Sequence, residues 1–209
     1  MKKKPEADFV IFDLGNVIVD IFYTETLDYI KQKVAPIHHE RVASFYLTDF
    51  HKDYEKGLIS SDEFRQEIKN YFEEDWSDEF VDHLWNYLLG KIPVERLELA
   101  KNLKEHYRTG VLSNTNEIHI QALNKILKED HGLESLHDLF EHVYFSHEMN
   151  LSKPDPLIYK ALVEDLNTTP EKVIFFDDLK ANVESAREIG IQAHQVTGPN
   201  VIFDFFKHV

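Results

Sequence analysis

The sequence predicts a doubly wound α/β fold, in which a parallel sheet carries helices on both faces and a helical segment follows the first strand. Short apolar runs at residues 9–12 and 173–176 are bounded by acidic residues, which is typical of strands buried on both faces of a parallel sheet. From residue 96 onward, strand-like and helix-like segments alternate, as they do in successive βαβ units.

Weaker strands are expected at residues 110–112, 142–145 and 191–196. Residues 20–92 differ, because they show amphipathic helical stripes and no convincing strand. Ser60 and Glu63 predict a capping box before the third of these helices. We therefore expect a core domain of residues 1–19 and 93–209, with a helical domain of residues 20–92 inserted into it. One mixed α+β domain is the alternative.

Composition excludes several classes of function. The 209 residues include 23 Lys and Arg against 38 Asp and Glu, a net charge of −15, which argues against a nucleic-acid partner. The chain has no cysteine, so disulfides, thiolate catalysis and Cys-ligated zinc are excluded. Its apolar runs are far shorter than the ~18 residues of a membrane helix, and Asp8 and Asp13 interrupt any signal-peptide core. We expect a soluble, cytoplasmic monomer or homodimer without a membrane or nucleic-acid partner.

Polar residues follow four of the expected strands at the point where each ends. In open α/β sheets ligands bind beyond the carboxyl ends of the strands, so these residues are expected around one crevice. They are Asp13 to Asn16, Ser113 to Asn116, the loop with Lys153 to Asp155, and Asp177 and Asp178 followed by Asn182.

Each of these residues also has a purely structural interpretation. Asp13 could begin a turn, Ser113 or Asn114 could cap the next helix, and Lys153 could be an exposed loop residue. Taken together, however, three carboxylates at adjacent strand ends would repel one another and would need a cation. All-oxygen ligands suit Mg²⁺. Neither standard pattern of a glycine-rich phosphate loop is present.

These motifs resemble, in order, the four motifs of the haloacid dehalogenase (HAD) superfamily. They are residues 11–17 (IFDLGNV), residues 111–114 (VLSN), Lys153 before Pro154 and Asp155, and residues 175–178 (FFDD) with Asn182. Residues 12–20 (FDLGNVIVD) and 111–116 (VLSNTN) are further similar to the bacterial α-D-glucose-1-phosphate phosphatase branch. The resemblance implies a Rossmann-like core and an α-helical cap domain at residues 20–92.

The resemblance also implies an activity and a role for each residue. The chain would be a Mg²⁺-dependent phosphatase for a small phosphate ester such as a hexose 1-phosphate, with Asp13 as the nucleophile that forms an aspartyl-phosphate. Ser113, the Asn114 backbone and Lys153 would hold the phosphoryl oxygens. Asp13, the Gly15 carbonyl and Asp178 would bind Mg²⁺, supported by Asp177 and Asn182.

One position departs from the family pattern. Most family phosphatases carry a second Asp two residues after the nucleophile as general acid and base, and here that residue is Gly15. The substrate could have a good leaving group, a residue such as His51 or Glu55 could replace the acid, or catalysis could be weak. A metal-independent dehalogenase that uses the same Asp nucleophile is one alternative, and Gly15 favours the other, a non-catalytic binding protein.

The remaining histidines and tryptophans predict no further site. No histidine pair has the helical spacing of a metal site with a nearby acid, so the twelve histidines are expected as ordinary surface residues. Trp76 and Trp85 lie in apolar stripes and are expected in a core.

Overall fold

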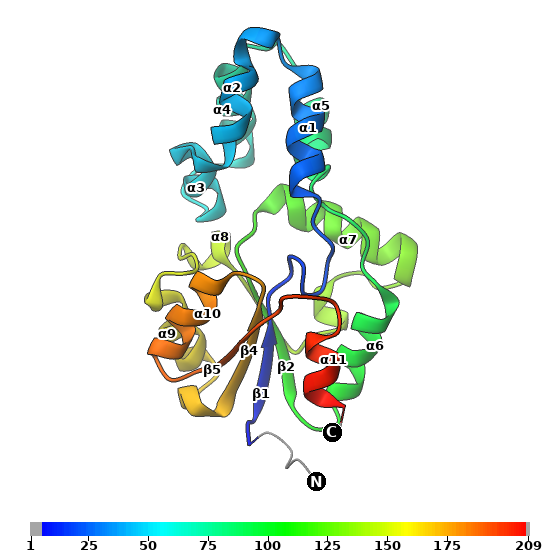
Figure 1. Cartoon of the computed structure of the whole chain (residues 1–209), viewed down its shortest axis with the longest axis vertical. Coiled ribbons are helices and arrows are strands. Elements are labelled where there is room, and N and C mark those ends of the chain that lie inside the picture. Colours follow the sequence, from blue (N-terminus) through cyan, green and yellow to red (C-terminus); the bar gives the residue numbers. More distant parts are fainter. Residues whose placement is uncertain (1–5, 208–209) are drawn as a thin grey trace.

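The computed structural model describes residues 6–207, so residues 1–5 and 208–209 of the expected core domain lie outside it. A five-stranded sheet forms the centre of the lower lobe in Figure 1, and its strands are all parallel in the order β3-β2-β1-β4-β5. The strands are β1 (Phe9–Phe12), β2 (Arg108–Ser113), β3 (His142–Phe145), β4 (Val173–Asp177) and β5 (Gln192–Gln195). The predicted parallel α/β class is confirmed, although the second strand is longer and the fifth shorter than expected.

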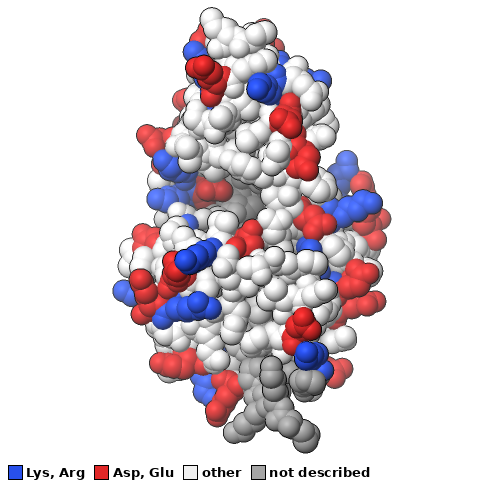
Figure 2. Space-filling view, in the orientation of Figure 1, with Lys and Arg blue, Asp and Glu red and all other residues white. Residues whose placement is uncertain are grey.

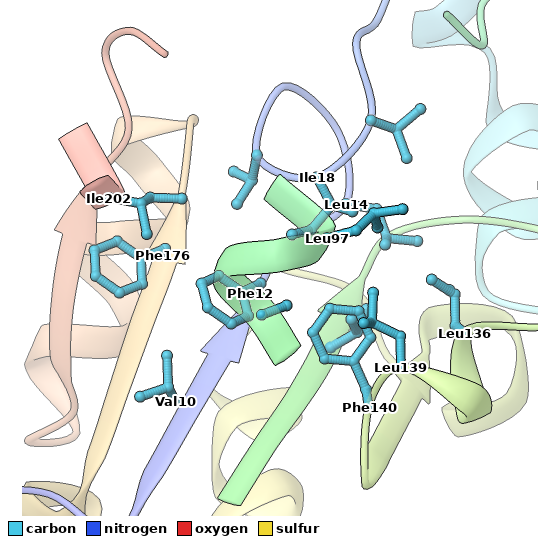
Figure 3. Close-up of a cluster of buried hydrophobic side chains, with 14 of the residues drawn as sticks. Val10, Phe12, Leu14, Ile18, Leu97, Leu136, Leu139, Phe140, Phe176 and Ile202 are labelled. Atoms are coloured by element: carbon cyan, nitrogen blue, oxygen red, sulfur yellow. The ribbon is translucent and has the colours of Figure 1, made fainter. Parts of the chain in front are cut away.

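Helices cover both faces of the sheet. Apolar side chains of α6 (Val94–Leu103), α7 (Glu117–His131) and α11 (Val201–Phe206) pack on one face. Figure 3 shows part of this cluster, in which Phe12 of β1 stacks on Phe176 of β4 with ring centroids 5.7 Å apart. The other face packs against α9 (Pro156–Asp165) and α10 (Lys180–Glu188). β1 and β4 are therefore buried on both sides, which explains their uninterrupted apolar runs.

A second lobe, which we call the helical lobe, lies above the carboxyl ends of the strands in Figure 1. It contains α1 (Tyr23–Lys33), α2 (His39–Ser44), α3 (Asp49–Glu55), α4 (Ser61–Phe72) and α5 (Asp78–Asn86). These helices bury an apolar cluster of their own that includes Phe45, Phe64 and Trp85. The expected core position of Trp85 is correct, and Trp76 packs against the same cluster.

The local signals at the ends of these helices are also present. Ser60 and Glu63 form the predicted capping box at the start of α4, where each side chain accepts a hydrogen bond from the backbone of the other.

The chain enters and leaves the helical lobe through two paired segments, in which Ile21 and Leu89 form an antiparallel bridge. Between residues 6 and 207, no helix combines the length and the apolar character needed to cross a bilayer.

The end of α3 is hydrogen-bonded to the lobe that contains the sheet. Ser146, in the short helix α8 (Ser146–Met149), donates from Oγ to the carbonyl oxygen of Glu55 at 2.5 Å. Asn150 donates from Nδ2 to the carbonyl oxygen of Lys56 at 2.8 Å. Gly57 follows at a φ of +65°, and a Cβ there would overlap the carbonyl oxygen of His147. This close approach explains the glycine and fixes the end of α3 over the sheet.

Gly57→Ala should destabilise the protein more than Gly132→Ala, its matched control. Both glycines adopt left-handed backbone, with φ values of +65° and +66°, which costs an alanine about 1–2 kcal/mol. A Cβ at Gly132 meets no atom within 4 Å, whereas one at Gly57 displaces α3 from His147. Urea unfolding of both variants measures the difference. Equal losses of unfolding free energy would show that the contact with the core is unimportant.

Candidate active site

Most of the polar residues that follow the strands converge on one cavity of about 440 Å³ beneath the helical lobe. Asp155 does not line it and instead caps α9 (Pro156–Asp165) by accepting from the Leu157 amide. Figure 2 shows a hollow between the two lobes with acidic side chains at its wall. The core contributes the loops after β1, β2, β3 and β4, and the helical lobe contributes residues from α3, α5 and their neighbours. Its lining includes Asp13, Gly15, Ser113, Asn114, Lys153, Asp178 and Asn182 from the core, and Tyr46, His51, Glu55 and Trp85 from the helical lobe.

Lys153 lies at the centre of this arrangement. Its ammonium donates to Asp13 Oδ1 at 2.7 Å, Asp177 Oδ2 at 2.7 Å and the Leu112 carbonyl at 2.9 Å, so each of its three protons has an acceptor. The residue is only 4% exposed, which excludes the interpretation as an exposed loop lysine. Burial lowers the pKa of a lysine, but the contacts with Asp13 and Asp177 outweigh that effect and raise the pKa of Lys153.

Asp13 is buried at the end of β1, where its backbone amide donates to the Phe176 carbonyl on β4. Burial raises the pKa of Asp13 to about 6, although the ammonium of Lys153 acts to lower it. Asp178, which is partly exposed, also has a raised pKa because of burial. Both carboxylates therefore lie where a bound cation would stabilise their ionised forms.

Asp13, Asp177 and Asp178 form a cluster that fits a divalent cation. One carboxylate oxygen from each lies within 4.8 Å of the other two, and oxygen donors of this kind suit Mg²⁺. Asp177 is fully buried, and its oxygens accept from Lys153, from Asn182 at 3.0 Å and from a backbone amide. Asp177 therefore orients its neighbours, while Asp13 and Asp178 line the cavity directly.

Asn114 joins two loops of the site. Its side-chain amide donates to the Lys153 carbonyl at 2.8 Å, and its Oδ1 accepts from the Lys153 backbone amide at 2.8 Å. The side chain is thus occupied in holding the Lys153 loop, and the backbone of Asn114 is the part that can meet a ligand. Ser113 is buried at the end of β2 and lines the cavity.

Several residues near the site were not assigned a role from the sequence. Asn16 has a left-handed backbone, with φ of 55°, and donates to Asp178 Oδ2 at 2.9 Å. Asn116, rather than Ser113 or Asn114, caps α7 by accepting from the His119 amide. Asparagine is favoured both in left-handed backbone and at the N-cap of a helix. The residue type alone could therefore have indicated both of these local roles.

Asn116 also connects the two lobes. Its Oδ1 accepts from Trp85 Nε1 at 3.1 Å, and the ring of Trp85 stacks on His119 with centroids 4.6 Å apart. The expectation that all histidines are ordinary surface residues is wrong for His38, His51 and His119, which are buried. The rings of the helical lobe surround His51, and the stack with Trp85 covers His119. Within the described residues, the aspartate cluster alone has the arrangement of a metal site.

Comparison with known proteins identifies relatives that cover nearly the whole chain. The D-ribitol-5-phosphate phosphatase of Bacteroides thetaiotaomicron is 26% identical over 89% of this chain and 90% of its own. A phosphorylated carbohydrates phosphatase of Thermotoga maritima is 27% identical over 88% of this chain and 82% of its own. Among solved structures, the HAD family enzyme BT-2542 of B. thetaiotaomicron, in complex with magnesium and inorganic phosphate, superposes with a TM-score of 0.85. It is 32% identical and covers 95% of this chain and 99% of its own.

The model of the haloacid dehalogenase-like hydrolases matches residues 7–190, a range that contains the helical lobe, strands β1 to β4 and every site residue described above. The chain therefore belongs to the haloacid dehalogenase-like hydrolase family.

Proposed function

We propose that the protein is a Mg²⁺-dependent phosphatase that hydrolyses a small phosphorylated carbohydrate through an aspartyl-phosphate on Asp13. The observation that supports this proposal most directly is the buried pairing of Asp13 with Lys153, next to Asp178, in the cavity between the two lobes. A binding protein has little use for a carboxylate fixed in this way. The phosphatase relatives favour the same reaction.

The reaction begins with attack of an Asp13 carboxylate oxygen on the phosphorus atom, as the bond to the leaving oxygen breaks. Water then hydrolyses the aspartyl-phosphate and regenerates Asp13. Lys153 orients Asp13 and, with Ser113 and the Asn114 backbone, stabilises the charge on the phosphoryl oxygens. The alkoxide or alcohol departs toward the helical lobe, which covers the cavity.

The cation would be held by Asp13, the carbonyl oxygen of Gly15 and Asp178, and Asp177 and Asn182 would support these ligands. When bound, Mg²⁺ neutralises the repulsion between the carboxylate and the phosphate. Asn16 would hold Asp178 in position through its 2.9 Å hydrogen bond. This arrangement provides positive charge for an anionic substrate within a chain of net charge −15.

The upper wall of the cavity supports a substrate the size of a sugar or sugar alcohol. Tyr23, Tyr46, Trp85 and two leucines line it, and aromatic rings pack well against the C–H faces of such molecules. A hexose 1-phosphate and a pentitol 5-phosphate are the two substrates to compare first. We further propose that residues 20–92 act as a cap domain on the core formed by residues 1–19 and 93–209.

An assay of phosphate release tests the proposal, with a hexose 1-phosphate, D-ribitol 5-phosphate and p-nitrophenyl phosphate as substrates. Turnover should be lost after treatment with EDTA and restored by added Mg²⁺, because the three clustered carboxylates need a cation to admit a phosphate dianion. Full activity in EDTA would contradict the proposal. Halide release from 2-haloacids without metal would instead support the dehalogenase alternative.

A further inference from the structure

The reaction proposed above requires a proton for the leaving oxygen, and Gly15 provides no side chain for it. An alkoxide is a poor leaving group, and a general acid typically contributes ~10²–10⁴ in rate. The titratable side chains that line the cavity are Asp13, Tyr23, Tyr46, His51, Glu55, His119, Lys153 and Asp178. Asp13, Lys153 and Asp178 already serve the nucleophile and the cation. The proton donor must therefore come from the other five.

The histidines and tyrosines are poorly suited to donate a proton and then accept one near neutral pH. Burial lowers the pKa of both His51 and His119 to about 4, so both rings are neutral. The two ring nitrogens of His119 are further engaged by the Trp85 carbonyl and by Asn116. Burial raises the pKa of Tyr46, and Tyr23 is 48% exposed at the solvent side of the cavity.

Glu55, unlike these histidines and tyrosines, presents a carboxyl group to the cavity. It is the last residue of α3, and its side chain is 26% exposed, toward the cavity that it shares with Asp13. We propose that Glu55 is the general acid that protonates the leaving oxygen and the general base that activates the water, in place of a carboxylate at Gly15. This inference rests on the proposed phosphatase function and assigns a second catalytic residue to it.

Hydrogen bonds through Ser146 connect the backbone of Glu55 to the loop after β2, which we propose binds the phosphate. The carbonyl oxygen of Glu55 accepts a hydrogen bond from Ser146 Oγ, and Ser146 Oγ in turn accepts one from the backbone amide of Thr115 at 2.9 Å. Thr115 follows Ser113 and Asn114 in the loop after β2. Ser146 is fully buried, so this connection is shielded from water. The end of α3 is thereby held to the loop after β2, and the Glu55 side chain lines the same cavity as Asp13.

The electrostatic surroundings of Glu55 suit a group that exchanges a proton near neutral pH. Burial raises its pKa to about 7; Lys153 acts against this rise and Asp13 adds to it. The other groups that face it are His51, whose Nε2 lies 3.8 Å from Glu55 Oε1, and Tyr46. A bound phosphate dianion raises the pKa further and keeps the carboxyl protonated for the first step.

Glu55 loses a proton in the first step of the reaction and regains one in the second. As Asp13 attacks phosphorus, the P–O bond to the leaving group breaks, and the Glu55 proton moves to that oxygen to give a neutral alcohol. The Glu55 carboxylate then accepts a proton from the water that attacks the aspartyl-phosphate. Inorganic phosphate leaves, Asp13 is again a carboxylate, and Glu55 is again protonated.

The test compares Glu55→Gln with Asp53→Asn, a control on the same helix whose side chain does not line the cavity. Steady-state rates are measured on D-ribitol 5-phosphate, which has an alkoxide leaving group, and on p-nitrophenyl phosphate, whose leaving group needs no proton. We expect Glu55→Gln to lower kcat/KM, which reports the steps up to departure of the leaving group, by about 10²–10⁴-fold on the first substrate and by less than about tenfold on the second. Because both substrates share the second step, loss of the base that activates water should lower kcat on both. Asp53→Asn should match the unaltered protein on both substrates.

The pH profile provides a second readout that a structural role would not change. For the unaltered protein, kcat/KM on D-ribitol 5-phosphate should fall as the pH rises through about 7, where Glu55 loses its proton. This decline should be absent in Glu55→Gln. Equal falls in kcat/KM on both substrates, or an unchanged pH profile, would overturn the role of Glu55 and leave the phosphatase proposal intact. If the unaltered protein hydrolyses neither ester with Mg²⁺, the phosphatase proposal and this inference both fail.

Discussion

Replacing Asp13 with asparagine should lower kcat by about 10⁵–10⁶-fold, the order of magnitude found when a covalent nucleophile is removed from an enzyme. The amide is neutral and a poor nucleophile, so no aspartyl-phosphate forms. The fold should persist, because Lys153 keeps its bonds to Asp177 and to the Leu112 carbonyl. Phosphate release from D-ribitol 5-phosphate and p-nitrophenyl phosphate measures the loss.

Two further variants make this result specific to the nucleophile. Asp8→Asn alters an exposed aspartate just before β1, at the end opposite the site, and should leave turnover unchanged. Asp13→Ala excludes activity regained by deamidation of the asparagine. If Asp13→Asn retained turnover within tenfold, Asp13 could not be the residue that attacks phosphorus.

Replacing Lys153 with methionine should both abolish turnover and destabilise the protein by about 3–5 kcal/mol, as expected when one partner of a buried ion pair is removed. Methionine fills a similar volume but leaves Asp13 and Asp177, which are 8% and 0% exposed, without their shared cation. Urea unfolding gives the change in unfolding free energy, and phosphate release gives the activity.

The double variant Lys153→Met, Asp177→Asn separates the two effects. Neutralising Asp177 removes one unpaired buried charge, so the double variant should unfold at a higher urea concentration than Lys153→Met alone. Its turnover should stay low, because Asp13 still lacks the ammonium that orients it. A single variant as stable as the unaltered protein would show that the three charges are not coupled.

The strands and the position of the site could be predicted from the sequence because burial on both faces leaves a clear pattern. Residues 9–12 of β1 and 173–176 of β4 are apolar without interruption, and polar residues begin directly after these runs. Parallel pairing then places Asp13 and Asp177 at the same edge, since Phe12 is in register with Phe176. The convergence of the motifs followed from topology alone.

The helix α3 could not be predicted in the same way, and it carries the residue that we propose as the general acid. Its inward residues His51 and Tyr54 are polar or aromatic, and Glu55 faces the cavity, so no aliphatic stripe marks the segment. The sequence suggested His51 and Glu55 equally. The surroundings distinguish the two residues. His51 is a neutral ring enclosed by aromatic side chains, whereas Glu55 is a carboxyl group whose pKa is influenced by Lys153.

The sequence also could not predict that the Asn114 side chain holds the loop of Lys153. Its two hydrogen bonds join residues 39 positions apart in the chain, and such long-range pairs leave no local pattern. The same applies to the bond between Trp85 and Asn116. The first pairing depends on how two loops of the core meet, and the second depends on how the two lobes meet.

The apolar cluster of the helical lobe has a consequence for how the protein unfolds. Ile118, which belongs to α7 of the core, is one of its buried members, and its backbone amide donates to the Tyr54 hydroxyl. The helical lobe on its own would therefore expose part of its interior to water. Each lobe contributes to the free energy that keeps the other folded, so heat or urea should melt both in one cooperative transition.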